Sequence, residues 1–303
     1  MSLRVAICIT THNRRAEVGR TLAQIARLDP QPDEILLVAD GCDDGTAGFI
    51  RAEHPHVRLI IHEQSRGSIP SRNEMASATA CDVFLSLDDD SHPIETDAIT
   101  RIRELFAGNR RLGVAAFPQR SDEYPGSLTT SDFGDARFVA SYANSAAAVR
   151  RECFLELGGY PGFFFHSYEE PDFALRCMNA AWQVRFEPAA VIRHHWTGTG
   201  RNELRIHHRH SRNEIWSVFL RCPMPWLLAV APFRAVRQFI YACKRGITWA
   251  LAEPVWWWQC LRGLGTCVKL RRALPWPAYR AWMKLLRTPH NDAARWARDF
   301  ESA

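Results

Sequence analysis

Short apolar runs alternate with helical patterns over the first 90 residues, and this alternation restricts the fold more than any other feature of the sequence. Continuous apolar runs of strand length are expected for strands that are buried on both faces. Residues 18–28 and 71–80 lie between such runs and carry apolar side chains at helical spacing. Strand–helix alternation predicts an α/β fold with a mainly parallel sheet flanked by helices. The four predicted strands are residues 5–10, 35–39, 57–62 and 83–87.

Polar clusters follow three of these strands directly. They occupy residues 11–14, 40–44 and 88–90. The carboxyl ends of parallel strands lie at one edge of a sheet, and ligands of open α/β sheets bind there. The sequence therefore predicts a ligand site built from these three loops.

The rest of the 303 residues falls into two parts. Further strand and helix patterns continue to about residue 203, and beyond it the pattern is helical only. We expect a mixed α/β domain over residues 1–220 and a helical C-terminal region over residues 221–303. The later strand patterns lie at 112–118, around 136–149 and at 183–196, and the later helices at 151–158 and 170–181.

The C-terminal region differs from the domain before it in charge and in tryptophan content. Residues 221–303 hold 14 Lys and Arg against 4 Asp and Glu, a net charge of +10, whereas residues 1–220 hold 24 against 29, a net charge of −5. Eight of the 11 tryptophans lie in this region. Cations beside tryptophans are typical of helices on anionic lipid surfaces, and packing of the tryptophans on the α/β domain is the alternative. No nucleic-acid recognition motif is present, so a nucleic-acid partner is not expected.

Nothing in the sequence indicates export. The N-terminus lacks the features of a signal peptide, and no run reaches the roughly 18 apolar residues of a membrane-spanning helix. The nine cysteines are scattered and contain no CxxC pair, which favours reduced thiols. We expect a cytoplasmic protein, with the inner face of the cell membrane as the surface to which the basic region would attach.

The triplet Asp88-Asp89-Asp90 is the most informative motif. It ends a buried strand, where carboxylates without partners are not tolerated. Oxygen ligands at this place suit Mg²⁺ or Mn²⁺, which also bind phosphate oxygens. Taken alone, the triplet is equally compatible with a solvated acidic turn.

The segments around this triplet give it a family context. One of them opens a helix with the pair Arg72-Asn73 after a glycine, and the next strand then leads to the triplet. In order and spacing the chain resembles the family 2 glycosyltransferases over about residues 1–220. The resemblance implies the GT-A fold, which has a Rossmann-like nucleotide-binding sheet, and inverting transfer from a nucleotide sugar. The segments that carry it are residues 5–14, 34–46, 67–76 and 82–90.

The resemblance also implies roles for single residues. Many members have two Asp before the glycine of the second-strand loop, whereas this chain has Ala39-Asp40, so Asp40 has to contact the nucleobase or the base selectivity differs. The metal ligands would be Asp88, Asp90 and a late histidine, for which His195 is preferred to His194. The nucleotide sugar would be bound by Thr10, Thr11, Asn13, Arg14, Asp40, Arg72, Asn73, Asp88, Asp89 and Arg212.

A second acidic cluster, Glu169-Glu170-Pro171-Asp172, resembles the acceptor-side motif Glu-Asp-x-Asp of the family. In inverting transfer a carboxylate takes the proton of the attacking hydroxyl, and apolar surroundings raise the pKa of such a carboxylate. Glu170 is the first choice for this base and Glu169 the second, while Asp172 is expected to orient the acceptor. Acidic residues that match the dipole of a helix N-terminus are the alternative.

Together these patterns predict a metal-dependent inverting glycosyltransferase that uses Mg²⁺ or Mn²⁺. It would move a sugar from a UDP-, dTDP- or GDP-linked donor to a hydroxyl of a glycan or of a lipid-linked acceptor. Two alternatives stay open: a nucleotidyltransferase that acts on a sugar phosphate, and a non-catalytic basic peripheral membrane protein with a vestigial nucleotide site. Against the first, no Gly-rich phosphate loop follows the first strand.

Overall fold

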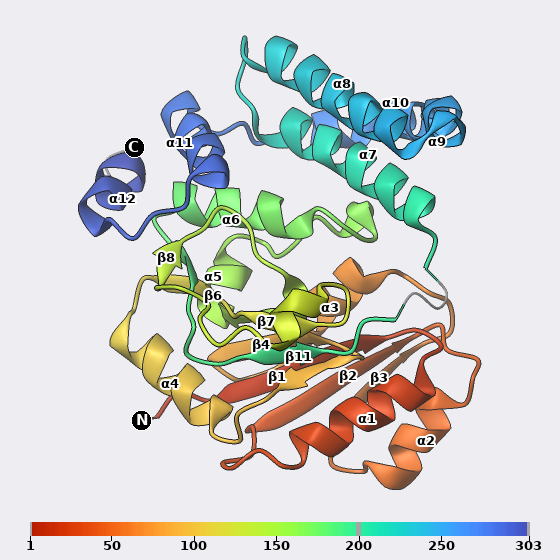
Figure 1. Cartoon of the computed structure of the whole chain (residues 1–303), viewed down its shortest axis with the longest axis vertical. Helices are drawn as coiled ribbons and strands as arrows, with labels where there is room; N and C mark the ends of the chain where they lie inside the picture. Colours follow the sequence, from red (N-terminus) through yellow and green to blue (C-terminus); the bar gives the residue numbers. More distant parts are fainter. Residues whose placement is uncertain (1, 198–200, 302–303) are drawn as a thin grey trace.

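A mixed sheet of eight strands forms the centre of the computed structural model, which describes residues 2–197 and 201–301 (Figure 1). The strand order is β3-β2-β1-β4-β9-β6-β10-β8. The first four strands of the chain pair in parallel and confirm the four predicted apolar runs. They are β1 (Val5–Thr11), β2 (Glu34–Asp40), β3 (Arg58–His62) and β4 (Val83–Asp88).

The other half of the sheet contains antiparallel pairs. β9 (Ala147–Arg150) runs antiparallel to both of its neighbours, β4 and β6 (Leu112–Ala116). β10 (Gln183–Phe186) is parallel to β6, and the edge strand β8 (Arg137–Phe138) is antiparallel to β10. The sheet is therefore mixed, as the sequence predicts.

A small second sheet continues directly from the aspartate triplet. Its order is β5-β11-β7, and β11 is antiparallel to β5 and parallel to β7. In the pairing of β11 with β5, His194 lies opposite Ser91. This register brings a segment 100 residues later in the chain next to the triplet. The strands are β5 (Ser91–Pro93), β7 (Gln119–Ser121) and β11 (Ile192–His194).

Helices cover both faces of the central sheet, and alternate strand residues face them. Ile7 and Ile9 of β1 pack against α1, α2 and α4, whereas Ala6 and Cys8 pack against α3, α5 and α6. α1 and α3 correspond to the predicted helices, while α2 and α4 were not predicted. The bounds are α1 (Arg15–Ile25), α2 (Thr46–Glu53), α3 (Ser68–Ala78), α4 (Ala98–Gly108), α5 (Arg151–Glu156) and α6 (Glu169–Asn179).

Six further helices follow the small sheet. α7, α8, α9 and α10 form a layer beyond α6, on the side away from the sheet, while α11 and α12 lie beside the opposite end of α6 (Figure 1). The described residues contain no helix that is long and apolar enough to cross a membrane. The bounds are α7 (Glu203–Arg221), α8 (Leu227–Arg245), α9 (Ile247–Ala252), α10 (Pro254–Lys269), α11 (Trp276–Arg287) and α12 (Ala293–Phe300).

The tryptophans of the C-terminal region divide into two groups. Trp256, Trp282 and Trp296 are buried in the same apolar cluster as one face of the central sheet. The indole of Trp282 donates a hydrogen bond of 2.9 Å to the carbonyl oxygen of Ala140. Trp257 and Trp258, in contrast, are exposed. The region therefore packs on the α/β domain and still presents aromatic side chains to its surroundings.

Gly263 provides a test of how α10 crosses α7. A β-carbon at Gly263 would lie 2.1 Å from Cζ2 of Trp216, whereas one at Gly265 would meet nothing within 4 Å. The Trp216 ring is buried and donates to the carbonyl oxygen of Cys260, so it has little room to move. We expect Gly263→Ala to lower the free energy of unfolding by about 1–3 kcal/mol in urea titrations. Gly265→Ala is the matched control and should be neutral or slightly stabilising; equal stability of the two variants would contradict this packing.

Candidate functional site

The carboxyl ends of β1, β2 and β4 lie side by side at one edge of the central sheet. In the strand register Thr10 lies opposite Asp88, and Thr11 lies opposite Ala39. The three polar loops that follow these strands therefore meet. Asn13 is exposed at this edge, and its side-chain oxygen accepts from the backbone N–H of Asp43 at 2.8 Å.

Asp89 points into the protein, away from solvent. Its carboxylate accepts a hydrogen bond of 2.8 Å from Oγ1 of Thr11 and one of 2.7 Å from Nη1 of Arg14. Burial raises the pKa of Asp89 to about 7, although the charge of Arg14 opposes this. Asp89 and Thr11 thus hold the loop in place, and only Arg14 of the three is partly exposed.

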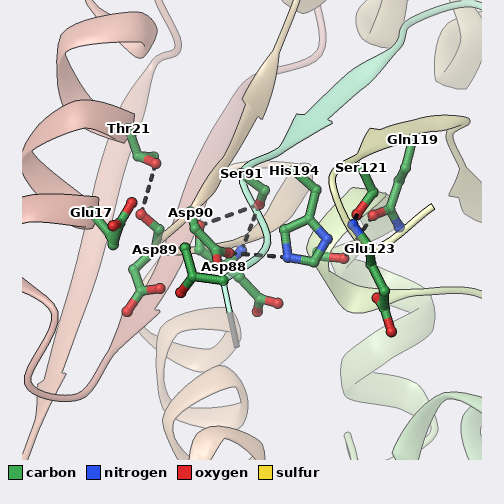
Figure 2. Close-up of polar contacts among 12 residues, drawn as sticks. Glu17, Thr21, Asp88, Asp89, Asp90, Ser91, Gln119, Ser121, Glu123 and His194 are labelled. Atoms are coloured by element: carbon green, nitrogen blue, oxygen red, sulfur yellow. Dashed lines mark hydrogen bonds and ion pairs between the residues drawn. The ribbon is translucent and has the colours of Figure 1, made fainter. Parts of the chain in front are cut away.

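Asp88, Asp90 and His194 form a cluster that could hold a metal ion. Each offers one ligand atom, and these atoms lie within 4.8 Å of one another (Figure 2). Nε2 of His194 is 3.1 Å from Oδ1 of Asp90, and among the residues that the structure describes neither atom has another hydrogen-bond partner, although both are buried. Burial alone would raise the pKa of Asp90, but His194 and Arg14 outweigh it and hold the pKa below its ordinary value. Two carboxylates and an imidazole suit a divalent cation such as Mn²⁺.

The structure corrects the choice between the two late histidines. Successive side chains of a strand point to opposite faces, so only one of the pair can face Asp90. His194 does so, whereas the ring of His195 stacks on His92 with 5.1 Å between the centroids. Only the backbone N–H of His195 contacts the triplet, at 2.8 Å from the carbonyl oxygen of Asp90. His195 is therefore not placed to bind the same ion.

Asp40 organises a loop and does not face a ligand. Its carboxylate accepts from Oγ of Ser65 at 2.7 Å and from the backbone N–H groups of Arg66 and Gly67 at 2.9 Å each. Nδ1 of His62 lies 2.7 Å from Oδ1 of Asp40. These partners hold the pKa of Asp40 below its ordinary value, although burial opposes them. The expected contact with a nucleobase does not fit a carboxylate whose oxygens are already engaged by its own chain.

Two other predicted nucleotide-sugar ligands also make internal contacts. The Asn73 amide donates to the carbonyl oxygen of Tyr160 and accepts from its N–H, both at 2.9 Å. The Arg212 guanidinium donates to the carbonyl oxygen of Phe164 at 3.0 Å and lies 4.4 Å from the centroid of the Trp216 ring. Asn73 therefore joins α3 to the loop before α6, and Arg212 joins α7 to the same region.

Arg72 connects the metal-binding cluster to the second acidic cluster. The guanidinium is 7% exposed, and it donates to Asp88 from Nη2 at 2.6 Å and to Oε1 of Glu169 from Nη1 at 3.2 Å. Glu169 also accepts from the side-chain amide of Asn144 at 3.1 Å. Burial would lower the pKa of Arg72, but the carboxylates raise it, so the bridge stays charged. One cation thus fixes the distance between the two acidic clusters.

Glu170 has a carboxyl group whose pKa lies well above its ordinary value. Its side chain keeps some exposure, and its Oε1 accepts from the backbone N–H of Asn144 at 3.3 Å. Burial among surrounding protein atoms and the charge of Glu169 raise the pKa of Glu170 to about 8, while Arg72 opposes the shift. The hydroxyl groups of Tyr142 and Tyr160 are close by as well, and burial, with a contribution from the charge of Glu170, raises the pKa of both. A carboxyl group with such a pKa can exchange a proton near neutral pH.

Asp172 does not have the environment expected of a residue that orients an acceptor. It is fully buried and accepts from Arg176 at 2.9 Å, from Arg221 at 2.9 and 3.2 Å, and from Ser217 at 3.0 Å. These contacts hold the pKa of Asp172 below its ordinary value against the effect of burial. The residue ties α6 to α7 and has no access to a substrate.

The loop before Glu169 contains contacts that the sequence did not reveal. Phe165, Ser167 and Tyr168 have φ angles of 69°, 74° and 69°, in a region that non-glycine residues rarely adopt. The Asn213 amide nitrogen lies within 3.2 Å of three carbonyl oxygens of this loop and holds it in shape. Asn144 and Tyr160 come from two different segments, so no local pattern could have indicated them, whereas Asn213 belongs to the local pair Arg212-Asn213.

This fold has counterparts among known proteins. The sequence model of Glycosyl transferase family 2 matches residues 6–162, which is more than half of the chain. The chain therefore belongs to glycosyl transferase family 2 and has the GT-A fold. None of the curated proteins matches it in sequence.

Solved structures of similar fold include three glycosyltransferases. The mannosyltransferase PcManGT from Pyrobaculum calidifontis, in complex with GDP-Man and Mn²⁺, is 18% identical with a TM-score of 0.58, over 95% of this chain and 85% of its own. GalNAc-T7 with UDP, GalNAc and Mn²⁺ is 15% identical with a TM-score of 0.59, over 74% of this chain and 49% of its own. TarS 1-349 from S. aureus with UDP is 12% identical with a TM-score of 0.53, over 72% of this chain and 66% of its own. The chain thus spans about half the length of the GalNAc-T7 chain.

The two histidines allow a direct test of the metal-binding cluster. We expect His194→Ala to weaken Mn²⁺ binding in the presence of UDP or GDP by at least about tenfold, because even the loss of a residue behind a metal ligand has effects of this size. Isothermal titration calorimetry measures the affinity. His195→Ala is the matched control and should bind Mn²⁺ with the same affinity as the protein without substitutions. A loss confined to His195→Ala would restore the assignment made from the sequence.

Proposed function

We propose that this chain is a metal-dependent inverting glycosyltransferase that moves a sugar from a nucleotide-sugar donor to a hydroxyl of a glycan or lipid-linked acceptor. One observation carries the proposal. Arg72 joins Asp88 of the metal-binding cluster to Glu169, the neighbour of a carboxyl group whose pKa is about 8. Such an arrangement provides a donor-binding half and a proton-accepting half at a fixed separation.

The donor half is built from Asp88, Asp90 and His194, which would hold the metal ion. A bound Mn²⁺ or Mg²⁺ would neutralise the donor diphosphate and stabilise the negative charge of the leaving nucleoside diphosphate. Arg14, partly exposed beside Asp90, would bind a phosphate oxygen as well. The solved structures of PcManGT and GalNAc-T7 contain Mn²⁺ together with a nucleotide, which supports this assignment. The nucleoside would lie over the ends of β1 and β2, near Asn13.

Glu170 is the residue we propose as the catalytic base. It would take the proton from the acceptor hydroxyl as that oxygen attacks C1 of the sugar and the nucleoside diphosphate leaves from the opposite side. Glu169 is less free for this role, because Arg72 and Asn144 already engage its Oε1. Asp172 is excluded by its complete burial. Membership of family 2 favours glycosyl transfer over nucleotidyl transfer, and two intact acidic clusters argue against a vestigial site.

The outer surface of the C-terminal helices supports attachment to a membrane. α8 turns polar side chains inward, where Arg234 and Gln238 donate to the buried carboxylate of Glu214. Its outer face carries apolar side chains instead, an inversion of the usual pattern of a surface helix. We call the exposed side chains of α8, α9 and α10 the apolar face: Leu228, Phe233, Val236, Phe239, Ile240, Tyr241, Ile247, Leu251, Val255, Trp257, Trp258, Leu261 and Val268.

Large apolar side chains exposed in this number on successive helices indicate a contact with a partner or a lipid. The net charge of +10 over residues 221–303 favours an anionic surface. We therefore propose that the apolar face lies in the interfacial region of a membrane, with the protein on its cytoplasmic side. Helices of this kind lie on the membrane without crossing it.

The catalytic base is tested by substitution and by pH. Glu170→Gln should lower the transfer rate by roughly 10²–10⁴ and leave donor affinity unchanged. Because the base acts in its deprotonated form, the rate of the unchanged chain should rise with pH through about 8. The measurement is transfer from UDP-, dTDP- and GDP-sugars to membrane lipid extracts. Glu169→Gln is the matched control. A larger loss of transfer rate in Glu169→Gln than in Glu170→Gln would assign the base to Glu169 instead.

Membrane attachment is tested by flotation with vesicles. Each Lys or Arg close to an anionic surface contributes about 1 kcal/mol, so full-length protein should float with anionic vesicles and less so as salt is added. Leu251→Ser removes a 74% exposed side chain of the apolar face and should reduce the binding that persists at high salt. Ile61→Ser, on β3, is the matched control and should have no effect. Failure to bind anionic vesicles at low salt would contradict the attachment.

A further inference from the structure

A groove between α7 and α10 is lined by several cationic side chains. Its volume is about 450 Å³, and its lining includes Arg205, His208, Arg209, Arg212, Val255 and Gln259. The three arginines are spaced by four and three residues along α7, which places them on one face of that helix. α7 therefore presents a row of guanidinium groups to the groove.

These arginines are not neutralised by neighbouring carboxylates. Within residues 2–197 and 201–301, no carboxylate forms an ion pair with Arg205, Arg209 or Arg212. Burial and the charge of the neighbouring arginine lower the pKa of both Arg209 and Arg212. The groups remain cationic because an arginine keeps its proton in proteins. An anion in the groove would relieve their mutual repulsion.

His208 gives a second and independent indication of a ligand. Its side chain is more than nine-tenths buried and lines the groove, yet Nε2 has no hydrogen-bond partner within the described part of the chain. The nearest carboxylate, Glu253, lies 3.9 Å away and is already engaged by His207 at 2.8 Å and by the indole of Trp256 at 2.7 Å. A buried polar atom without a partner is unfavourable, and a ligand in the groove would satisfy it.

The groove shares a residue with the apolar face, and one of its arginines contacts the loop before α6. Val255 belongs to both the groove and the apolar face, and it is 51% exposed. On the other side, the Arg209 guanidinium lies 4.8 Å from the centroid of the Phe165 ring. Phe165 is part of the strained loop that leads to Glu169 and Glu170. A molecule that reached from the membrane to the catalytic base would therefore pass this groove.

We propose that the groove binds the phosphate or diphosphate group of a lipid-linked acceptor, whose hydrocarbon chain lies along the apolar face. This inference rests on the proposed function and names the class of its acceptor. The guanidinium groups of Arg205 and Arg209 would donate to the phosphate oxygens, a geometry for which arginine is suited. His208 would add a neutral N–H donor, and Val255 would contact the first carbons of the lipid. The donor diphosphate has a separate place, because the groove includes none of the metal-binding residues.

The test compares vesicles that differ in the kind of phosphate they carry. Full-length protein is floated with phosphatidylcholine vesicles that contain a polyprenyl phosphate, and with vesicles of the same surface charge made with phosphatidylglycerol. We expect the protein to bind the vesicles with polyprenyl phosphate more tightly than those with phosphatidylglycerol. Its affinity for the former should fall about tenfold for each arginine removed, in Arg205→Gln and in Arg205→Gln/Arg209→Gln. Arg280→Gln/Arg287→Gln, on α11, is the matched control with the same change of charge. Arg205 is exposed, so Arg205→Gln removes a charge without removing buried packing contacts.

Three results would overturn this inference. The first is equal binding of the two kinds of vesicle by the protein without substitutions. The second is an equal loss of affinity for the polyprenyl phosphate vesicles in the two double variants. The third is a parallel loss of Mn²⁺-dependent UDP or GDP binding in the groove variants. The last would place the arginines in the donor site. Nucleotide binding is measured separately on each protein, so absence of Mn²⁺-dependent nucleotide binding in the unchanged chain contradicts the proposed function and leaves the vesicle preference as an independent result.

Discussion

The arrangement of the site depends on one buried cation. Arg72 is almost completely removed from solvent and lies between Asp88 and Glu169, which come from the end of β4 and the start of α6. The pair of Arg72 with Glu169 is buried on both sides, whereas Asp88 is partly exposed. Removal of one partner from a buried ion pair costs about 3–5 kcal/mol. The planar group can donate to both carboxylates at once, which a lysine could not do in the same geometry.

The position of Arg72 depends on contacts made by Asp40 at the end of β2. Asp40 binds the N–H groups of Arg66 and Gly67 and so fixes the loop that starts α3. Gly67 has a φ of 96°, and a β-carbon there would lie 2.4 Å from the carbonyl oxygen of Phe165. The loop and the segment before α6 can therefore approach closely only with glycine at this position. A carboxylate expected to read a nucleobase serves instead to place the central cation.

The sequence predicted the elements with a regular pattern and the residues that belong to local motifs. The first four strands are continuous apolar runs, and the aspartate triplet with its preceding Arg72 lies within 19 residues. Contacts between distant segments were not predictable in this way. Asp172 carries the same acidic signal as Glu170, yet Arg221, 49 residues later, buries it in an ion pair. His194 and His195 are neighbours, and only the pairing of β11 with β5 decides which of them meets Asp90.

The coupling of Arg72 to Glu170, the proposed catalytic base, can be measured through the pH dependence of transfer. Arg72 lowers the pKa of Glu170, so its charge opposes the effects of burial and of Glu169. Replacement by a neutral side chain removes only the lowering contribution. We therefore expect the midpoint of the pH–rate profile to lie at a higher pH for Arg72→Gln than for the protein without substitutions. An unchanged midpoint, in a variant that still transfers sugar, would contradict the claim that one buried cation links the two halves of the site.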